Sequence, residues 1–318
     1  MSLDTLKGAE LKQYYDRVLL MRAKKDTIFE NYATKRPIPA RGGKSIEFRR
    51  FERIDMYAGS YTLLEGTPPA ATNATINKVE ATISQYGMFS EVTDMLNLQA
   101  FDPIMSNYAE VYGEAMAEGR DLVIQSEFSN ATTIQYADAA TVVATSGAGA
   151  VGSGNYLDAA ELLEAKRTLR RNNAKPIIDS KVICFIHPDN TKDLFEDADI
   201  VEAFQHAAPR AESNPLFTGV LGDWMGIRFI ETTNLKVRSS YGMSGADIYE
   251  VILCGKEAYG VSDLSAMAAR MYVQKPGGVT DPLEQKSTIG WKCAMAAKIL
   301  NNDFMVLINV ASSKTPSA

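Results

Sequence analysis

Two strand-like segments enclose a long, turn-rich stretch, and this arrangement constrains the fold more than any other feature of the sequence. Ser45–Arg53 and Ile76–Val92 have strand character, and the second alternates apolar and polar side chains from Val79 onward, as a half-buried strand does. The segment between them, Tyr57–Thr75, is rich in Pro, Gly, Thr and Ala. A monomer rarely keeps so long a connection without a purpose. We therefore expect a protruding hairpin whose tip lies on a neighbouring molecule.

The predicted hairpin also supplies the candidate residues for contacts between subunits. Large apolar side chains at its tip would be a liability on an isolated monomer. The candidates are four residues of the tip and two arginines of the first strand: Tyr57, Tyr61, Leu63, Leu64, Arg49 and Arg50. The arginines belong to a basic segment, Lys35–Arg53, in which Phe48 and Phe51 are interleaved. A nucleic-acid-binding protein is therefore one alternative, although strand periodicity divides these charges between two faces.

A long helix follows the hairpin. Asp102 suits a helix N-cap and Pro103 the first helical position, and the apolar spacing continues to Phe128. About 25 residues at 1.5 Å each form a rod of roughly 37 Å. Periodicity predicts further helices over Leu6–Phe29, Leu157–Arg171 and Asp189–Phe204, and strands over Lys181–His187, Gly226–Glu231 and Ile248–Cys254. The final segments ARMYVQK, IGWKCAMAAKIL and DFMVLINV predict a three-stranded antiparallel group.

The composition excludes several classes of protein. The chain has 39 Asp and Glu against 33 Lys and Arg, a net charge of −6, which argues against general affinity for nucleic acid or anionic membrane. The uncharged stretch Ala139–Leu157 is full of Gly, Ser and Thr, which indicates a loop and not a membrane helix. The three cysteines, Cys184, Cys254 and Cys293, lie far apart in the sequence. We therefore expect reduced, buried thiols in a protein made in the cytoplasm.

The sharpest chemical motif is Gly147–Gly152, which fits the G-x-G-x-x-G pattern and precedes a predicted helix. A nucleotide-binding turn uses such glycines to bring its backbone close to a pyrophosphate. Here Ser153-Gly154-Asn155 separates the last glycine from the helix, and no acidic residue follows at the expected distance. We favour a small-residue loop, and we keep a nucleotide-binding α/β enzyme as a second alternative.

No other segment predicts catalysis or metal binding. The sequence has no G-x-S-x-G elbow. The acidic run of Glu196, Asp197, Asp199 and Glu202 lacks the pattern of a calcium-binding loop. The two histidines, His187 and His206, do not stand at metal-ligand spacing. We therefore expect no catalytic, cofactor-binding or metal-binding residues, and a subunit that wraps around its neighbours explains the arm, hairpin and rod better than an enzyme does.

The order of these segments resembles the major capsid proteins of tailed bacteriophages, and more closely the branch typified by the coat protein of phage N4. The arm, the hairpin and the Asp-Pro-initiated helix carry the first part of this resemblance. The rest lies in IHPDNTKDL from Ile186 and in three segments at matching order and spacing: Asn214–Leu235, Tyr249–Leu264 and Asp281–Ile308.

The resemblance implies an α+β fold of the Hong Kong 97-like class. By analogy, residues 1–44 form the N-terminal arm and residues 45–95 the extended hairpin called the E-loop. Residues 96–155 and 261–318 form the peripheral domain with its spine helix, and residues 156–260 the axial domain. The sequence provides no matched positions for a covalent cross-link between subunits.

The implied function is structural. Copies of the chain would assemble into pentamers and hexamers of an icosahedral head that encloses double-stranded DNA without sequence specificity. The implied partners are other copies, a portal ring and a scaffolding protein, with a decoration protein as a further candidate and no membrane. The implied location is the virion, after synthesis in the cytoplasm of a host bacterium.

Overall fold

The structure is a computed structural model that describes residues 28–39, 43–52, 54, 65–66, 73–99, 104–137, 151–207, 222–264, 269–274 and 283–314. The predicted tip residues Tyr57, Tyr61, Leu63 and Leu64 lie outside these ranges. So do the predicted helix start at Asp102-Pro103 and the predicted N-terminal helix up to residue 27.

The first sheet is built around one long strand, β13 (Lys286–Ile299). Its ten-residue pairing with β4 is antiparallel, and on its other side it pairs with β12 and then with β11. The remaining strands of this five-stranded sheet are β1 (Thr34–Lys35), β4 (Ser84–Thr93), β11 (Tyr259–Asp263) and β12 (Arg270–Gln274).

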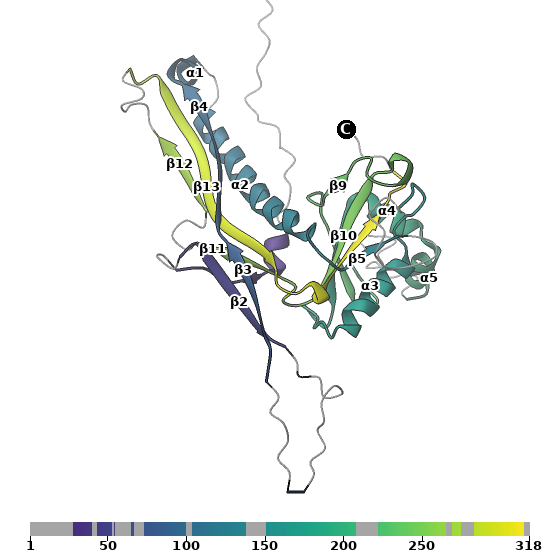
Figure 1. The fold of residues 1–318 in the computed structure, drawn as a ribbon. Coiled ribbons are helices and arrows are strands. Elements are labelled where there is room, and N and C mark those ends of the chain that lie inside the picture. The colour runs from purple at the N-terminus through teal and green to yellow at the C-terminus, as the bar shows by residue number, and fades with distance from the viewer. Residues whose placement is uncertain are drawn as a thin grey trace, which may run out of the picture.

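The predicted rod is helix α2 (Ile104–Phe128), which runs along this sheet (Figure 1). Its side chains Ile124 and Phe128 are fully buried in one cluster with Trp291 and Met295 of β13. Gly119 allows the close approach, because a Cβ there would lie 3.1 Å from the Trp291 ring. The predicted end at Phe128 is confirmed. Short helix α1 (Asp94–Gln99) follows β4 at the far end of the sheet.

The second sheet has seven strands in the order β5-β14-β10-β6-β8-β7, with β9 pairing to β10. Strand β10 is buried at every position, since it lies in the middle with helices on one face. The strands are β5 (Ile134–Tyr136), β6 (Val182–Ile186), β7 (Asp223–Trp224), β8 (Ile227–Glu231), β9 (Val237–Arg238), β10 (Ile248–Cys254) and β14 (Met305–Val310).

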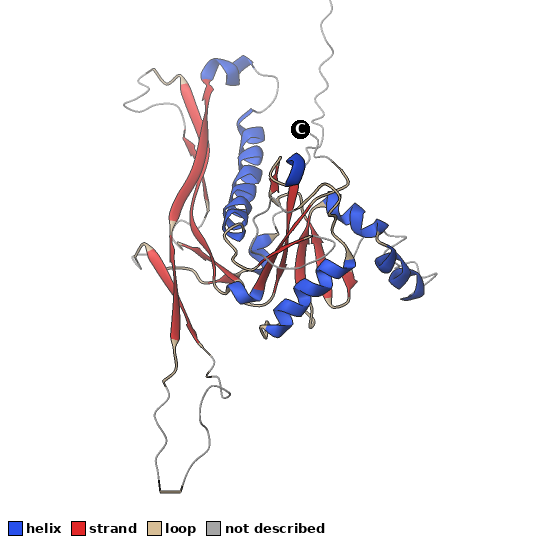
Figure 2. Cartoon of the chain, turned by 45° about the vertical axis from the view of Figure 1, so that its right-hand side comes forward, coloured by secondary structure: helices blue, strands red, loops and turns tan. Residues whose placement is uncertain are grey.

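Three helices cover one face of the second sheet (Figure 2). Leu162, Ala165 and Leu169 of α3 are fully buried there with the alternate residues of β10 and β14, and this confirms the predicted apolar face. The opposite face receives Phe29 of the short 3-10 helix η1 (Phe29–Tyr32), whose ring meets Phe128 and Phe185 edge-on. The helices are α3 (Ala159–Arg171), α4 (Pro188–Glu196) and α5 (Ala198–Ala207), with 3-10 turns η3 (Met243–Gly245) and η4 (Asn302–Phe304).

The predicted hairpin is present but its second strand is shorter than predicted. Strand β2 (Ser45–Phe51) pairs antiparallel with β3 (Ile76–Thr82), from Ser45–Thr82 to Phe51–Ile76. The chain then changes sheets at Ile83, so that the predicted strand Ile76–Val92 is two strands in two sheets. The buried side chain of Ile83 packs beside Ala294 and Ala296 of β13, which explains why the break occurs there.

Two further expectations were wrong. The helix predicted over Asp189–Phe204 is interrupted at Asp197, which has extended backbone and whose carboxylate accepts a hydrogen bond from the Ala159 amide at 2.7 Å. The final strand does not complete a three-stranded group with β12 and β13. Strand β14 crosses to the second sheet, where it lies antiparallel to β10 and parallel to β5. The predicted strands over Lys181–His187, Gly226–Glu231 and Ile248–Cys254 are confirmed as β6, β8 and β10.

Candidate functional site

The β2–β3 hairpin has a buried root and an exposed distal end. Phe48 and Ala81 are buried against Ala294 and Ala296 of β13. At the other end of the ladder Phe51, 71% exposed, lies opposite Ile76, also exposed. Figure 1 shows the hairpin leaving the body of the molecule on the side opposite to α1. The root can therefore hold the hairpin in place while its distal end contacts something else.

The two arginines predicted as contact residues lie on opposite faces of β2. Arg49 is exposed, and its Nε donates to Glu47 at 2.8 Å. Arg50 is half-buried, and its Nη2 donates to Glu52 at 2.6 Å. These carboxylates belong to the same hairpin, so they offset the charge of the basic segment. The geometry favours a charged protein contact surface over a track for nucleic-acid phosphates.

A second exposed apolar surface lies on the β4–β13–β12 part of the first sheet. Phe89, Gly290 and Tyr272 stand side by side across the three strands, and Phe89 is 69% exposed. Because glycine has no side chain, the two rings flank a hollow of about 480 Å³. Sequence reasoning missed this surface, because the alignment of the three residues depends on strand register.

A buried aspartate fastens the chain to α2 where the N-terminal region meets the body. Asp121 accepts hydrogen bonds from the Ile28 and Phe29 amides at 3.0 and 3.2 Å, and from Asn234 Nδ2 at 3.2 Å. Burial raises the pKa of Asp121, against the opposing effect of these hydrogen bonds. The carboxylate thus connects η1, α2 and the loop after β8 at one point.

The neighbouring residue on α2, Arg120, makes a second connection. Its Nη2 lies 3.0 Å from Glu30 of η1 and 2.9 Å from Asp263 of β11. Burial disfavours ionisation of Glu30, but Arg120 and Lys35 together outweigh it and lower the pKa of that carboxyl. Two consecutive residues therefore anchor the segment that leads out of the N-terminal region.

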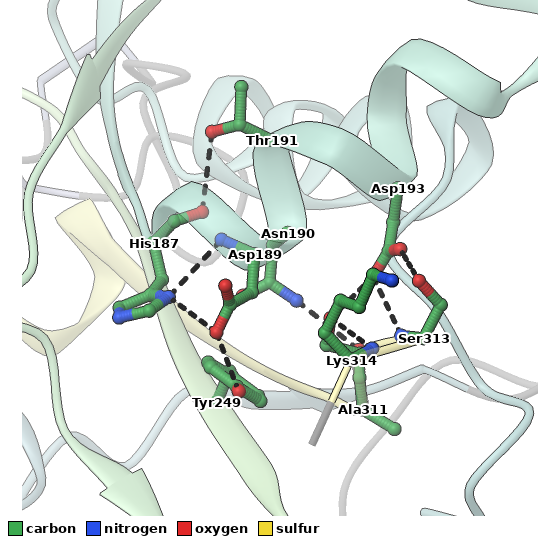
Figure 3. A network of polar contacts seen from close by, with 10 residues as sticks. His187, Asp189, Asn190, Thr191, Asp193, Tyr249, Ala311, Ser313 and Lys314 are labelled. Atoms are coloured by element: carbon green, nitrogen blue, oxygen red, sulfur yellow. Dashed lines mark hydrogen bonds and ion pairs between the residues drawn. The ribbon is translucent and has the colours of Figure 1, made fainter. Parts of the chain in front are cut away.

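Polar side chains gather where α4 begins and β14 ends (Figure 3). His187 caps α4 by accepting from the Asp189 amide through Nδ1 at 3.3 Å. Tyr249 donates to the Asp189 carboxylate at 2.8 Å. Asn190 donates to the Ala311 carbonyl oxygen at 3.2 Å. This network fastens α4 to both β10 and the end of β14.

The network has the residue types of a hydrolase triad but not its geometry. The Ser313 hydroxyl donates to Asp193 at 2.5 Å, whereas His187 contacts Asp189 and the ring of Tyr249. A triad needs the hydroxyl on the histidine. Burial lowers the pKa of His187, against the opposing charges of Asp189 and Glu231, so its ring is neutral near pH 7. The arrangement is structural: it holds the residues that follow β14.

The remaining sequence candidates gain no support as chemical sites. Most of Gly147–Gly152 lies outside the described residues, and Gly152 precedes the start of α3 at Ala159 by a turn and a loop. Among the described residues, no group of His, Cys, Asp and Glu is placed to hold a metal ion. The three cysteines are buried and unpaired. Within the same ranges, no helix is long and apolar enough to cross a membrane.

One buried ion pair was missed although the sequence contained a signal for it. Glu250 is completely buried in the otherwise apolar strand β10, where it forms an ion pair with Arg238 of β9 and accepts from Ser129 Oγ at 2.9 Å. A charged residue in such a strand requires a partner. The sequence signal was therefore Glu250 itself, although its partner could not be identified from spacing.

The architecture defines a class of fold: two cores, a long helix along one sheet and a hairpin that leaves the body. Comparison with solved structures gives the same fold. The chain is similar to the capsid protein of cyanophage P-SCSP1u, with a TM-score of 0.72, 18% identity and coverage of 97% of this chain and 95% of that one.

Two further capsid structures match over nearly the full length. For the acid-stable capsid of Helicobacter pylori bacteriophage KHP30 the TM-score is 0.74, at 12% identity and 98% coverage of both chains. For the capsid of Ralstonia phage GP4 it is 0.71, at 14% identity and 98% coverage of both chains. These likenesses show the Hong Kong 97-like fold. A search of curated proteins finds no match.

The sequence itself establishes the family. The model of the family described as phage capsid protein matches residues 9–258, well over half of the chain. The chain therefore belongs to the phage capsid protein family. It is a structural, non-enzymatic major capsid protein of a tailed-phage head, and its place is the virion.

Proposed function

We propose that copies of this chain assemble into the pentamers and hexamers of an icosahedral head that encloses double-stranded DNA. The observation that carries this proposal is the hairpin, whose root is buried against β13 while Phe51 and Ile76 are exposed at its distal end. Exposed apolar residues on a protruding ribbon are stabilised when a neighbouring copy covers them.

The division of labour along the chain is part of the same proposal. Residues 1–44 serve as the N-terminal arm, 45–95 as the E-loop, 96–155 with 261–318 as the peripheral domain, and 156–260 as the axial domain. The two sheets support two bodies of this kind. Strand β14, from the range assigned to the peripheral domain, nevertheless pairs in the second sheet, and β11, which begins in the range assigned to the axial domain, pairs in the first. The contact candidates at the tip, with Arg49 and Arg50, keep their proposed role toward neighbouring subunits.

We further propose the partners of the shell. A portal ring, a scaffolding protein and a decoration protein are the proteins that a head of this type would contact, and the coat protein branch of phage N4 is the proposed relationship. The packaged DNA would be held without sequence specificity. The acidic balance of the chain supports a container, since a strongly basic lining would bind the DNA and hinder its entry and ejection.

Size-exclusion chromatography with light scattering, followed by negative-stain microscopy, tests this function. We expect rings or closed shells from the purified chain, alone or co-expressed with a scaffolding protein. A chain that stays monomeric under both conditions would contradict the proposal. Deleting residues 57–75 while keeping β2 and β3 should leave a folded chain that no longer forms stable closed shells. Normal shells from this deletion would remove the hairpin tip from the mechanism.

A further inference from the structure

Helix α3 has a cluster of positive charge toward its C-terminal end. Four cations and one apolar residue share its exposed side, and together with Met225 they line a hollow of about 630 Å³. We name this surface the cationic end: Leu163, Lys166, Arg167, Arg170, Arg171 and Met225. The spacing of these helical residues places them on adjacent turns of one face.

The cationic end is crowded with like charge. Burial lowers the pKa of Lys166, and the charge of Arg170 lowers it further. Arg167 pairs with Glu164, its Nε lying 2.6 Å from Oε2. Within the described residues, no ion pair with a carboxylate is found for Lys166, Arg170 or Arg171. A partner that brings negative charge would therefore relieve this repulsion.

An apolar side chain stands beside these cations at some cost to the backbone. Met225 occupies the turn between β7 and β8 with φ of 49°, followed by Gly226 with φ of 74°. Such turns favour Asn or Gly, and a left-handed conformation costs other residues about 1–2 kcal/mol. The Met225 side chain is nonetheless 59% exposed at the hollow. Exposed Met225 and Leu163 add an apolar component to the charged surface.

The opposite end of α3 is acidic. Asp158 caps the helix, and Asp197 lies against its first turn, where it accepts from the Ala159 amide at 2.7 Å. Burial raises the pKa of Asp158, and the charges of Asp197 and Asp199 raise it further. We name the carboxylates here the acidic end: Asp158, Glu196, Asp197, Asp199 and Glu202, of which Glu196, Asp199 and Glu202 are exposed.

The two ends cannot meet within one chain. Helix α3 has 13 residues, so about 20 Å of rigid helix separates them. Two copies arranged head to tail can bring opposite ends together, and this contact repeats from copy to copy around a ring.

We propose that the cationic end of one copy docks on the acidic end of the next copy within a capsomer. This inference rests on the proposed function, and it specifies one surface that joins neighbouring subunits. Charge complementarity selects the occupant, because the surface that the cations require is present on the same chain. The apolar rim of Met225 and Leu163 fits a protein surface better than a phosphate backbone, which offers charge alone.

Charge reversal and its restoration test the proposal. Arg170→Glu with Arg171→Glu makes both ends acidic, and Asp199→Lys with Glu202→Lys makes the acidic end basic. Each variant should raise the protein concentration needed for assembly by about tenfold, because attraction becomes repulsion at two positions. A chain that carries all four substitutions has its ends exchanged, so it should assemble at close to the wild-type concentration. Assembly is measured by light scattering and electron microscopy.

The control is Lys256→Glu with Lys314→Glu, which makes the same change in net charge as Arg170→Glu with Arg171→Glu, at exposed positions outside the cationic end and outside the hairpin. It should assemble like the wild type. If thermal unfolding shows that reversal disturbs the end of α3, Arg170→Gln with Arg171→Gln removes the charges without reversing them. This milder variant should raise the required concentration about threefold.

The outcomes separate this inference from the proposed function. Shells from the wild type and from every reversed variant at equal concentration would overturn the inference and leave the function standing. Folded single-end variants that the fourfold variant does not restore would also overturn it. If loss of assembly instead follows loss of binding to duplex DNA, the cationic end contacts nucleic acid and the proposal is wrong. A wild-type chain that never assembles would overturn both.

Discussion

Replacing Asp121 with alanine should loosen the joint between the N-terminal region and the body. The carboxylate accepts hydrogen bonds from the Phe29 amide and from Asn234, both buried, and from the partly buried Ile28 amide. Each buried donor left without an acceptor costs about 1–3 kcal/mol. Part of this is returned, because burial already disfavours the ionised carboxylate. We expect Asp121→Ala to lower the free energy of unfolding by about 2–4 kcal/mol.

Urea unfolding of the soluble subunit at pH 7 measures this change, and proteolysis near Phe29 shows whether the joint opens locally. Asp121→Asn keeps one acceptor oxygen and should cost about 1–2 kcal/mol. The control is Ser126→Ala, an exposed position on the same helix, which should stay within about 0.5 kcal/mol of the wild type. An alanine variant as stable as that control would refute the anchoring role of Asp121.

The pH dependence of Asp121 gives an independent check with a definite sign. Its pKa is raised in the folded chain, so the protonated form is favoured by folding. The contribution of Asp121 is therefore largest below its unfolded pKa, about 4, and decreases as pH rises through the folded value. The stability difference between wild type and Asp121→Asn should shrink from acid toward neutral pH. A difference that grows over this range would show that the hydrogen bonds outweigh burial.

Three further predictions test contacts within the two sheets. Arg238→Ala leaves Glu250 buried without its ion-pair partner, so it should lower the free energy of unfolding in urea by about 3–5 kcal/mol. The double variant Arg238→Ala with Glu250→Leu should recover most of this loss. Equal stability of the single and double variants would contradict the pairing. Arg228 and Lys181 lower the pKa of Asp223 to about 2. Its contribution to folding stability is therefore present above about pH 4 and is lost as pH falls toward 2. Because the side chain is 33% exposed, Asp223→Asn should lower the free energy of unfolding by only about 1 kcal/mol at pH 7 and by nearly nothing at pH 2. A Cβ at Gly290 would meet Met88 O and Phe89 Cβ at 2.6 Å, so Gly290→Ala should lower the melting temperature by an amount equivalent to about 1–3 kcal/mol, whereas Gly154→Ala, with nothing within 4 Å, should not.

Local pattern predicted those elements whose environment repeats along the sequence. The apolar face of α3 at Leu162, Ala165 and Leu169 could be identified because it packs on one core. The continuous apolar run of β6 could be identified because a core covers each of its two faces. The same reasoning failed at Ile83, where alternation continues across the change of sheet. It also failed at Asp197, where a contact with Ala159 outweighs helix propensity. Both failures depend on residues distant in sequence.

Some of the candidate surfaces could likewise be predicted from the sequence, and others could not. The protruding hairpin followed from the length and composition of the segment between its strands. Arg49 and Arg50 lie on its first strand, and their role in contacts between subunits stays a prediction. The hollow beside Phe89 and Tyr272 could not be predicted, because it exists only in the register that β13 imposes on its two neighbours. The anchor at Asp121 likewise joins residues about ninety positions apart.

The position of β14 has a consequence for the order of events during synthesis. This strand, Met305–Val310, lies between β10 and the edge strand β5 of the second sheet. The sheet cannot close until these residues have left the ribosome, so the earlier strands must wait in an open state with apolar edges exposed. A chain that ends before β14 would leave β10 and β5 without the strand that pairs with both. We therefore expect such a chain to keep unpaired strand edges and to be absent from assembled shells.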